Sequence, residues 1–263
     1  MISNPNNATI RQIRKLRKRR DRDRRRRLII EGHRALSVAL ASKADVTQVV
    51  HTPAAIGKRD ELLREARAKG SQVLEVTPVV MASLSSVETA PDVLGVVSMP
   101  EATVAEAIGR LGLGAVLAGI KDPATAGSIL SSCAAAGGVA AIATKGTTDL
   151  FAPKAMRAGA GAHYVLSVAN DVPLEECGRA LRDAGVRILA VHADGPAIAI
   201  QHVAGPVAIV IAGDEGVPEL LEGEPVGPGT RSDVVRPSIA AEAAVVLFEA
   251  ARRGAEGVAG TTG

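Results

Sequence analysis

Apolar and polar positions alternate along the first hundred residues in blocks that predict strands and helices in turn. Short apolar runs typical of buried strands are separated by stretches in which apolar residues recur at helical spacing. The predicted strands are residues 28–30, 46–50, 72–76 and 93–97, and the predicted helices are 9–20, 33–41, 59–69 and a short one from residue 78. This alternation predicts a small α/β unit.

The same pattern starts again after residue 112 and continues nearly to the end of the chain. The predicted strands are residues 115–118, 139–143, 164–167, 186–191 and 207–211, and the predicted helices are 124–136, 174–184 and 238–253. Strands that alternate with helices favour a mostly parallel sheet covered on both faces. We therefore expect a second α/β domain, preceded by a linker with a short helix.

The amino-terminal part of the chain is far more basic than the rest. Residues 11–34 contain 13 Lys or Arg and 3 Asp or Glu, a local balance of +10, whereas the whole chain carries +3. Such a segment is typical of phosphate binding, because each neutralised phosphate releases a counterion. The alternative is a disordered basic tail. The candidate phosphate contacts are Arg17, Arg20, Arg24, Arg25 and Arg26.

Composition excludes several classes of protein. Cys133 and Cys177 are too few for a disulfide framework, which fits a cytoplasmic setting. No apolar run is long enough to span a bilayer, and the arginine-rich start lacks the apolar region of a signal peptide, so we expect no membrane partner. His and Cys residues lack zinc spacing, and P-loop and dinucleotide patterns are missing from the sequence. We therefore expect no metal, nucleoside triphosphate or NAD chemistry.

Three turn-rich stretches follow predicted strands of the second domain. They are residues 121–128 (KDPATAGS), 213–216 (GDEG) and 227–238 (GPGTRSDVVRPS). In a parallel sheet, ligands gather at the carboxyl ends of the strands, where loops and helix amino termini present free N–H groups. Taken singly, each stretch is equally consistent with ordinary turn chemistry.

Taken together, these stretches resemble the three motifs of the SpoU/TrmH family of SPOUT RNA 2′-O-ribose methyltransferases. Residues 122–133 (DPATAGSILSSC) are similar to the family's D-P-x-N-x-G-(T/S)-I-x-R-(T/S)-A, and residues 213–216 to its G-(N/A)-E-G. Residues 153–162 (PKAMRAGAGA) resemble its P-K-x-x-R-A-S-x-G-A segment. The basic helix followed by residues 28–32 (LIIEG) resembles the family's substrate-binding domain. The resemblance covers nearly the whole chain.

The resemblance implies a SPOUT-type, trefoil-knotted parallel-sheet domain preceded by a small α/β RNA-binding domain. The corresponding divisions are a basic arm or helix at 1–27, a substrate-binding domain at 28–100, a linker at 101–112 and a methyltransferase domain at 113–263. The resemblance also implies S-adenosylmethionine as cofactor and ribosomal or transfer RNA as substrate. It further implies a homodimer, with the last helix and the first-motif helix at its interface.

The family pattern also implies roles for individual positions. The implied cofactor contacts are His192, Gly213, Glu215, Gly216, Pro228, Gly229, Pro237 and Ser238. The implied catalytic positions are Ser131, Arg157, Glu215 and Ser238, and Lys154 is a further candidate RNA contact. A lone histidine at a strand end is often structural, so that reading of His192 stays open. Glu215 is also suited to pair with a basic residue or to fix its loop.

The sequence departs from the family at three motif positions. Ser131 stands where the family has a catalytic arginine, and Thr125 and Ser238 stand where it has asparagines. A guanidinium can hold a phosphate or favour alkoxide formation in a way that a hydroxyl cannot. Arg157 and Lys154 are the nearest candidate substitutes, and the alternative for both is a solvated helix face.

These departures leave three hypotheses for function. The first is S-adenosylmethionine-dependent 2′-O-methylation of RNA. The second is a degenerate homologue that binds RNA without methylating it, which the replaced arginine and asparagine favour. The third is an α/β enzyme unrelated to RNA that carries a basic tail.

Overall fold

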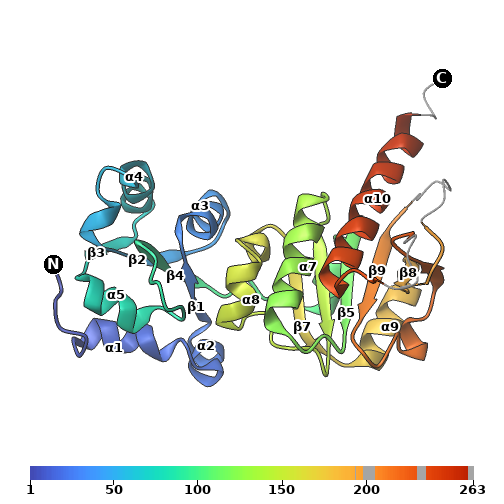
Figure 1. Ribbon diagram of the computed structural model, residues 1–263, viewed down its shortest axis with the longest axis horizontal. Helices are drawn as coiled ribbons and strands as arrows, with labels where there is room; N and C mark the ends of the chain where they lie inside the picture. The colour runs from blue at the N-terminus through green and yellow to red at the C-terminus, as the bar shows by residue number, and fades with distance from the viewer. Residues whose placement is uncertain (193, 198–204, 230–234, 260–263) are drawn as a thin grey trace. The chain divides into compact units, whose positions relative to one another are not determined.

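The computed structural model describes residues 1–192, 194–197, 205–229 and 235–259, and these form two compact units (Figure 1). The first unit comprises Met1–Pro100 together with Phe151–Tyr164. The second comprises Glu101–Leu150 and Val165–Gly263. The chain therefore leaves the second unit after Leu150, contributes a short segment to the first, and returns at Val165.

The first unit is built on a mixed sheet whose described strands have the order β1-β4-β2-β3. Strand β1 (Arg27–Glu31) is antiparallel to β4 (Val93–Ser98), which is antiparallel to β2 (Val46–His51). Strand β3 (Gln72–Glu75) is parallel to β2. Its helices are α1 (Ala8–Lys15), α2 (Arg19–Arg25), α3 (His33–Ala41), α4 (Asp60–Ala68), α5 (Pro78–Leu84) and α8 (Pro153–Ala158).

The basic amino-terminal segment is part of this unit and not a separate arm. Ile10, Ile13 and Leu16 are buried in a core cluster that includes Val80 and Leu84 of α5. Their helical spacing places them on one side of α1 and leaves the basic residues on the other. The helix expected over 9–20 is divided into α1 and α2.

The second unit is built on a sheet whose described strands are all parallel, in the order β10-β8-β9-β5-β6-β7. These strands are β5 (Leu113–Ala118), β6 (Ala140–Thr144), β7 (Ser167–Val172), β8 (Arg187–Val191), β9 (Val207–Ala212) and β10 (Glu224–Val226). Its helices are α6 (Val104–Gly109), α7 (Pro123–Ala135), α9 (Leu174–Asp183) and α10 (Ile239–Ala259). Helices α7 and α10 lie side by side (Figure 1). The expected parallel α/β architecture is confirmed.

Three expectations for this part of the chain differ from the structure. The strand predicted at 164–167 is wrong, because Ala162–Tyr164 is a 3₁₀ turn and the strand is β7. The short strand β10 was not predicted. Residues 151–164, predicted as part of the second domain, belong to the first unit. The predicted trefoil knot involves the third motif stretch, of which residues 230–234 lie outside the described residues.

Helix length and hydropathy also bear on membrane association. Among the helices that the structure describes, none is both long enough and apolar enough to cross a membrane. The longest of them, α10, carries Glu242, Glu249 and Arg252 along its length.

Candidate functional site

The carboxyl ends of the strands of the second unit lie along one edge of the sheet, because these strands are all parallel. Strand β9 lies next to β5, and β8 lies between β9 and β10. The first, second and third motif stretches follow β5, β9 and β10. The structure therefore brings together, at one edge, three stretches that are far apart in the sequence. The loop after β8, which carries His192, lies at the same edge of the sheet.

The first two motif loops touch through their backbones at Gly213. Its N–H donates a hydrogen bond to the carbonyl oxygen of Ala118, at 2.8 Å. A Cβ atom on residue 213 would lie 2.4 Å from the carbonyl oxygen of Gly119, closer than real Cβ atoms approach. The turn is closed by Gly216, which has a φ of 78° and donates from its N–H to the Gly213 carbonyl oxygen at 3.0 Å. Residue 213 must therefore be glycine for the loops to approach this closely.

The first loop leads into α7 through a side-chain cap. Asp122 accepts hydrogen bonds from the N–H and the hydroxyl of Thr125, at 2.9 and 3.1 Å, and Pro123 occupies the first turn. Thr125, where the family has asparagine, thus supports the helix start. Thr147 fixes the other end of the loop, since its hydroxyl accepts from the Gly119 N–H at 3.0 Å and donates to the Leu117 carbonyl at 2.9 Å. Sequence reasoning missed Thr147, because a threonine in a turn carries no distinguishing signal.

The loops after β8 and β10 are joined in the same manner. The His192 N–H donates to the Val226 carbonyl, and the Gly227 N–H donates to the Pro196 carbonyl, both at 2.8 Å. A Cβ atom on Gly227 would lie 2.4 Å from the carbonyl oxygen of Gly195. His192 contributes its backbone to this contact while its side chain is exposed. Pro228 and Gly229, predicted from the third motif, follow directly, and Gly229 has a φ of 64°.

An ion pair connects the segment just before α10 to the loop after β8. The Arg236 guanidinium donates to both carboxylate oxygens of Asp194, at 2.8 and 3.0 Å. The Ser238 carbonyl accepts the N–H of Glu242 at 2.9 Å, and Pro237, between Arg236 and Ser238, is exposed. Burial raises the pKa of Glu242; the Arg236 charge lowers this pKa and the Asp194 charge raises it. Arg236, Asp194 and Glu242 were missed, because their sequence separation hides the contact.

The remaining predicted catalytic positions are divided between the two units. Ser131 is half-buried in the middle of α7, and the exposed Glu215 carboxylate lies 3.9 Å from the Lys121 ammonium. Arg157 and Lys154 lie on α8, which belongs to the first unit. Arg157 instead donates a hydrogen bond to the Ser86 hydroxyl, at 2.9 Å. The roles of these residues stay predictions.

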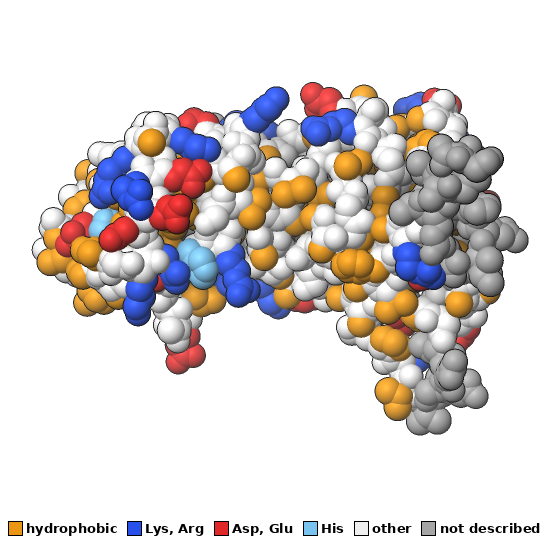
Figure 2. Space-filling model, turned by 90° about the horizontal axis from the view of Figure 1, so that it is seen from above, with side chains coloured by type: hydrophobic (Ala, Val, Ile, Leu, Met, Phe, Trp, Pro, Cys, Tyr) orange, Lys and Arg blue, Asp and Glu red, His pale blue; other side chains and the backbone are white. Residues whose placement is uncertain are grey.

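The predicted phosphate contacts lie on and around α2. Their side chains are exposed except that of Arg25, which is half-buried and hydrogen-bonded to Gln12. Arg24 pairs with Asp21 at 3.1 Å. The predicted contacts are Arg17, Arg20, Arg24, Arg25 and Arg26. The face shown in Figure 2, by contrast, mixes basic and acidic side chains over the first unit. Within the described part of the chain, no group of His, Cys, Asp and Glu could hold a metal ion.

Two protein-family models match the chain. The MRM3-like substrate binding domain matches residues 7–95, and the SpoU rRNA Methylase family matches residues 112–221. Human rRNA methyltransferase 3, mitochondrial, is 27% identical over 162 residues, which cover 59% of this chain and 37% of that protein. The 23S rRNA (guanosine(2553)-2′-O)-methyltransferase RlmP of Bacillus subtilis is 25% identical over 169 residues, 64% of each chain. The matched part thus spans less than two thirds of either relative.

Solved structures share the fold of both units. The AdoMet-bound rRNA methyltransferase from Sinorhizobium meliloti has a TM-score of 0.79 at 24% identity, covering 95% of this chain and 97% of that one. The SpoU methyltransferase AviRb from Streptomyces viridochromogenes, in complex with the cofactor AdoMet, also has a TM-score of 0.79, at 22% identity, covering 95% of this chain and all of that one. At this identity the likeness establishes the fold.

Proposed function

We propose that this chain, whose residues 112–221 match the SpoU rRNA Methylase family, transfers a methyl group from S-adenosylmethionine to a ribose 2′-hydroxyl of ribosomal or transfer RNA. The observation that carries the proposal is the meeting of the three motif stretches at the carboxyl edge of one parallel sheet. Open α/β sheets bind their ligands at this edge. The matches to an rRNA methylase family and to a substrate binding domain argue against the hypothesis of an enzyme unrelated to RNA.

The loops at this edge fit the chemistry of the proposed methyl donor, a sulfonium cation joined to adenosine. Gly213, Gly216 and Gly229 carry no side chains, so a ligand can approach the backbone of these loops closely. The exposed Glu215 carboxylate, 3.9 Å from the Lys121 ammonium, adds a negative charge that favours a cation nearby. The Asp194 carboxylate is already paired with Arg236. When bound there, the donor would supply an electrophilic methyl group.

The chain's own residues would act mainly by positioning. Methyl transfer needs an in-line approach of the 2′-oxygen and removal of its proton. The Ser131 hydroxyl cannot replace a guanidinium, and loss of such a donor typically lowers a rate by about 100-fold to 1000-fold. Arg236, held by both oxygens of Asp194, presents a guanidinium at the motif loops. We assign to Arg236 the orientation of the RNA backbone beside the donor.

The experiment that tests this function measures methyl incorporation. Total RNA from a strain lacking the gene is incubated with the purified chain and S-adenosylmethionine carrying a radiolabelled methyl group. The expected result is stoichiometric labelling of one RNA species, resistant to base removal because the label sits on ribose. No calorimetric binding of S-adenosylmethionine at millimolar concentration would remove the proposal.

The second candidate function is RNA binding without methyl transfer. It is favoured by Ser131 and Ser238, which stand in place of the family's arginine and asparagine. This candidate predicts RNA binding together with no incorporation of label in the assay above. Stoichiometric incorporation would exclude it.

We also propose that the chain forms a homodimer through α7 and α10. Val245 and Phe248 of α10 are 50% and 49% exposed, and their spacing of three residues places them on one side of the helix. Neighbouring α7 presents the small side chains of Ser128 and Ala135 outside its buried face. Apolar and small side chains permit close packing of a second copy. Light scattering that gives only the monomer mass at micromolar concentration would contradict this.

A further inference from the structure

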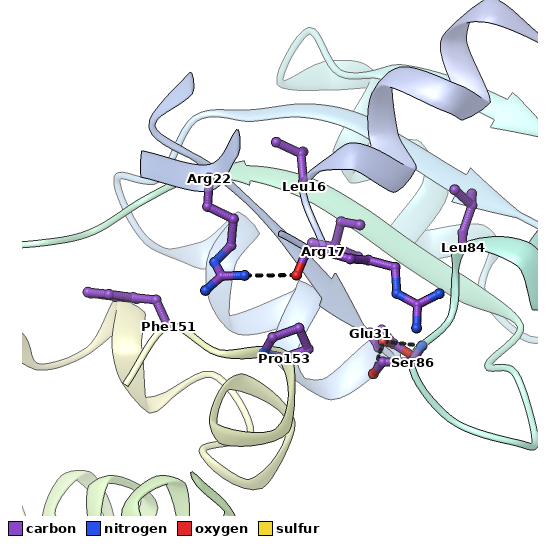
Figure 3. A pocket seen from close by; sticks show the side chains of 9 residues that line it. Leu16, Arg17, Arg22, Glu31, Leu84, Ser86, Phe151 and Pro153 are labelled. Carbon is purple, nitrogen blue, oxygen red and sulfur yellow. Dashed lines mark hydrogen bonds between the residues drawn. The ribbon is translucent and has the colours of Figure 1, made fainter. Parts of the chain in front are cut away.

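A small hollow in the first unit is lined by polar residues from separate stretches of the chain (Figure 3). Arg17 and Arg22 come from the amino-terminal helical segment, Glu31 from β1, and Ser86 from the loop after α5. Pro153, at the start of α8, completes the wall. The hollow has room for about one water molecule, so it can accept one oxygen atom of a phosphate group whose remainder stays outside, but not a nucleobase.

Glu31 fixes the loop that carries Ser86. One of its carboxylate oxygens accepts from the Ser86 N–H at 2.9 Å and from the Ser86 hydroxyl at 2.6 Å, and the other accepts from the Ser85 hydroxyl at 2.7 Å. Because the Ser86 proton is donated to Glu31, its oxygen is oriented to accept from Arg157, at 2.9 Å. The exposed Arg157 guanidinium is thus held at Ser86 by one of its five N–H groups.

A second guanidinium is presented from the amino-terminal side. Arg22 is 4% exposed, and it donates to the Arg17 carbonyl oxygen at 3.0 Å, which fixes the turn between α1 and α2. The exposed Arg17 side chain points towards Glu31 and Ser86 (Figure 3). The net charge around Ser86 is +2, because the three guanidinium groups of Arg17, Arg22 and Arg157 outnumber the one carboxylate of Glu31.

We propose that Arg17 and Arg157 together hold one phosphodiester group of the RNA at this hollow, with Glu31 and Ser86 as positioning residues. The inference rests on the proposed function for its ligand, and it assigns Arg157 to RNA capture instead of methyl transfer. A guanidinium presents paired N–H groups that match phosphate oxygens. Base stacking is excluded at the hollow because Phe151, its aromatic lining residue, is 1% exposed.

The test compares Arg157→Gln with Arg64→Gln, which removes the same charge from an exposed position on α4 outside the hollow. Binding of a fluorescent oligouridylate of about 12 nucleotides is followed by anisotropy between about 50 and about 200 mM salt. We expect Arg157→Gln to weaken binding about tenfold and to reduce the slope of log K against log salt by about 0.7. The Arg64→Gln chain should bind within about twofold of wild type. Equal behaviour of the two variants would overturn the inference.

Two further measurements separate positioning from folding and RNA from free phosphate. Ser86→Ala keeps every charge, so we expect weaker oligouridylate binding with an unchanged melting temperature; wild-type affinity would remove Ser86 from the site. The Nε–Hε resonances of Arg17 and Arg157 should shift with oligouridylate at concentrations where inorganic phosphate has no effect. Shifts produced equally by inorganic phosphate would identify a free-anion site and contradict the RNA assignment.

Failure of this inference can be told apart from failure of the proposed function. A wild-type chain that binds oligouridylate through Arg157 but incorporates no methyl label would overturn methyl transfer and leave the phosphate site standing. A chain that methylates RNA while Arg157→Gln behaves like Arg64→Gln would overturn the phosphate site alone.

Discussion

Replacement of Gly213 by alanine perturbs the contact between the first two motif loops directly. The added Cβ would lie 2.4 Å from the Gly119 carbonyl oxygen, whereas contacts under 3.0 Å are essentially never seen, so the loops must separate by at least the difference, 0.6 Å. Overpacking of this kind typically destabilises by about 1 to about 3 kcal/mol. For a domain of this size that corresponds to a melting temperature lower by about 2 to about 12 °C.

The same substitution should weaken binding of the methyl donor. Misplacement of a ligand-binding loop by a fraction of an ångström reduces complementarity, and we expect an affinity loss of about tenfold. Calorimetry measures both melting and S-adenosylmethionine binding. Gly112→Ala is the matched control, because a Cβ there meets no atom within 4 Å and the residue lies in the same unit. Wild-type melting and affinity in the Gly213→Ala chain would refute the reasoning.

Other predictions concern individual side chains. Ser131→Ala should leave methyl incorporation within about twofold, whereas Arg236→Gln should lower it about tenfold or more; a large loss with Ser131→Ala would show that the hydroxyl acts. Burial raises the pKa of Glu242 above 4.5, so its protonated form stabilises the fold below pH 4.5 and this contribution is lost as pH rises through the raised pKa. Glu242→Gln should therefore raise the melting temperature at neutral pH and not under acidic conditions; an equal gain at both would contradict this. Burial raises the thiol pKa of Cys133 and of Cys177 to about 12, so an aromatic disulfide reagent should label them only after unfolding, and rapid native labelling would count against their burial.

The architecture was predictable where local signals and the fold agree. The uninterrupted apolar run at 207–211 indicated a buried strand, and β9 is buried along nearly all its length. The pattern predicted a helix over 124–136, and α7 spans Pro123–Ala135. Because the strands were expected to be parallel, their convergence at one edge followed from topology. The meeting of the motif loops could therefore be predicted from the sequence.

Elements that depend on tertiary contacts could not be predicted from the sequence. Strand β7 includes Asn170 and Asp171, residue types depleted in strands, and Asp171 has a φ of 60°. The Asn170 side chain accepts the N–H of Leu150, a contact between residues 20 positions apart. Strand β10 is three residues long and contains a proline. Pairing with neighbouring strands overrides these local preferences.

The placement of Arg157 shows a second limit of sequence reasoning. The family resemblance suggested a substitute for the missing motif arginine, but its segment packs into the first unit. A Cβ on Gly161 would lie 2.8 Å from the Val38 side chain, which shows how closely this segment approaches α3. In the sequence, Arg22 cannot be distinguished from the surface arginines next to it, but its side chain is buried. Neither fact has a local sequence signal, because each depends on residues distant in the chain.

A crystal structure of the chain with S-adenosylhomocysteine would show whether the motif loops bind the methyl donor. We expect electron density for the ligand between the loops that follow β8, β9 and β10, in contact with the backbone at 213–216 and 227–229. Density on another face of the second unit, or an empty edge at saturating ligand, would contradict it.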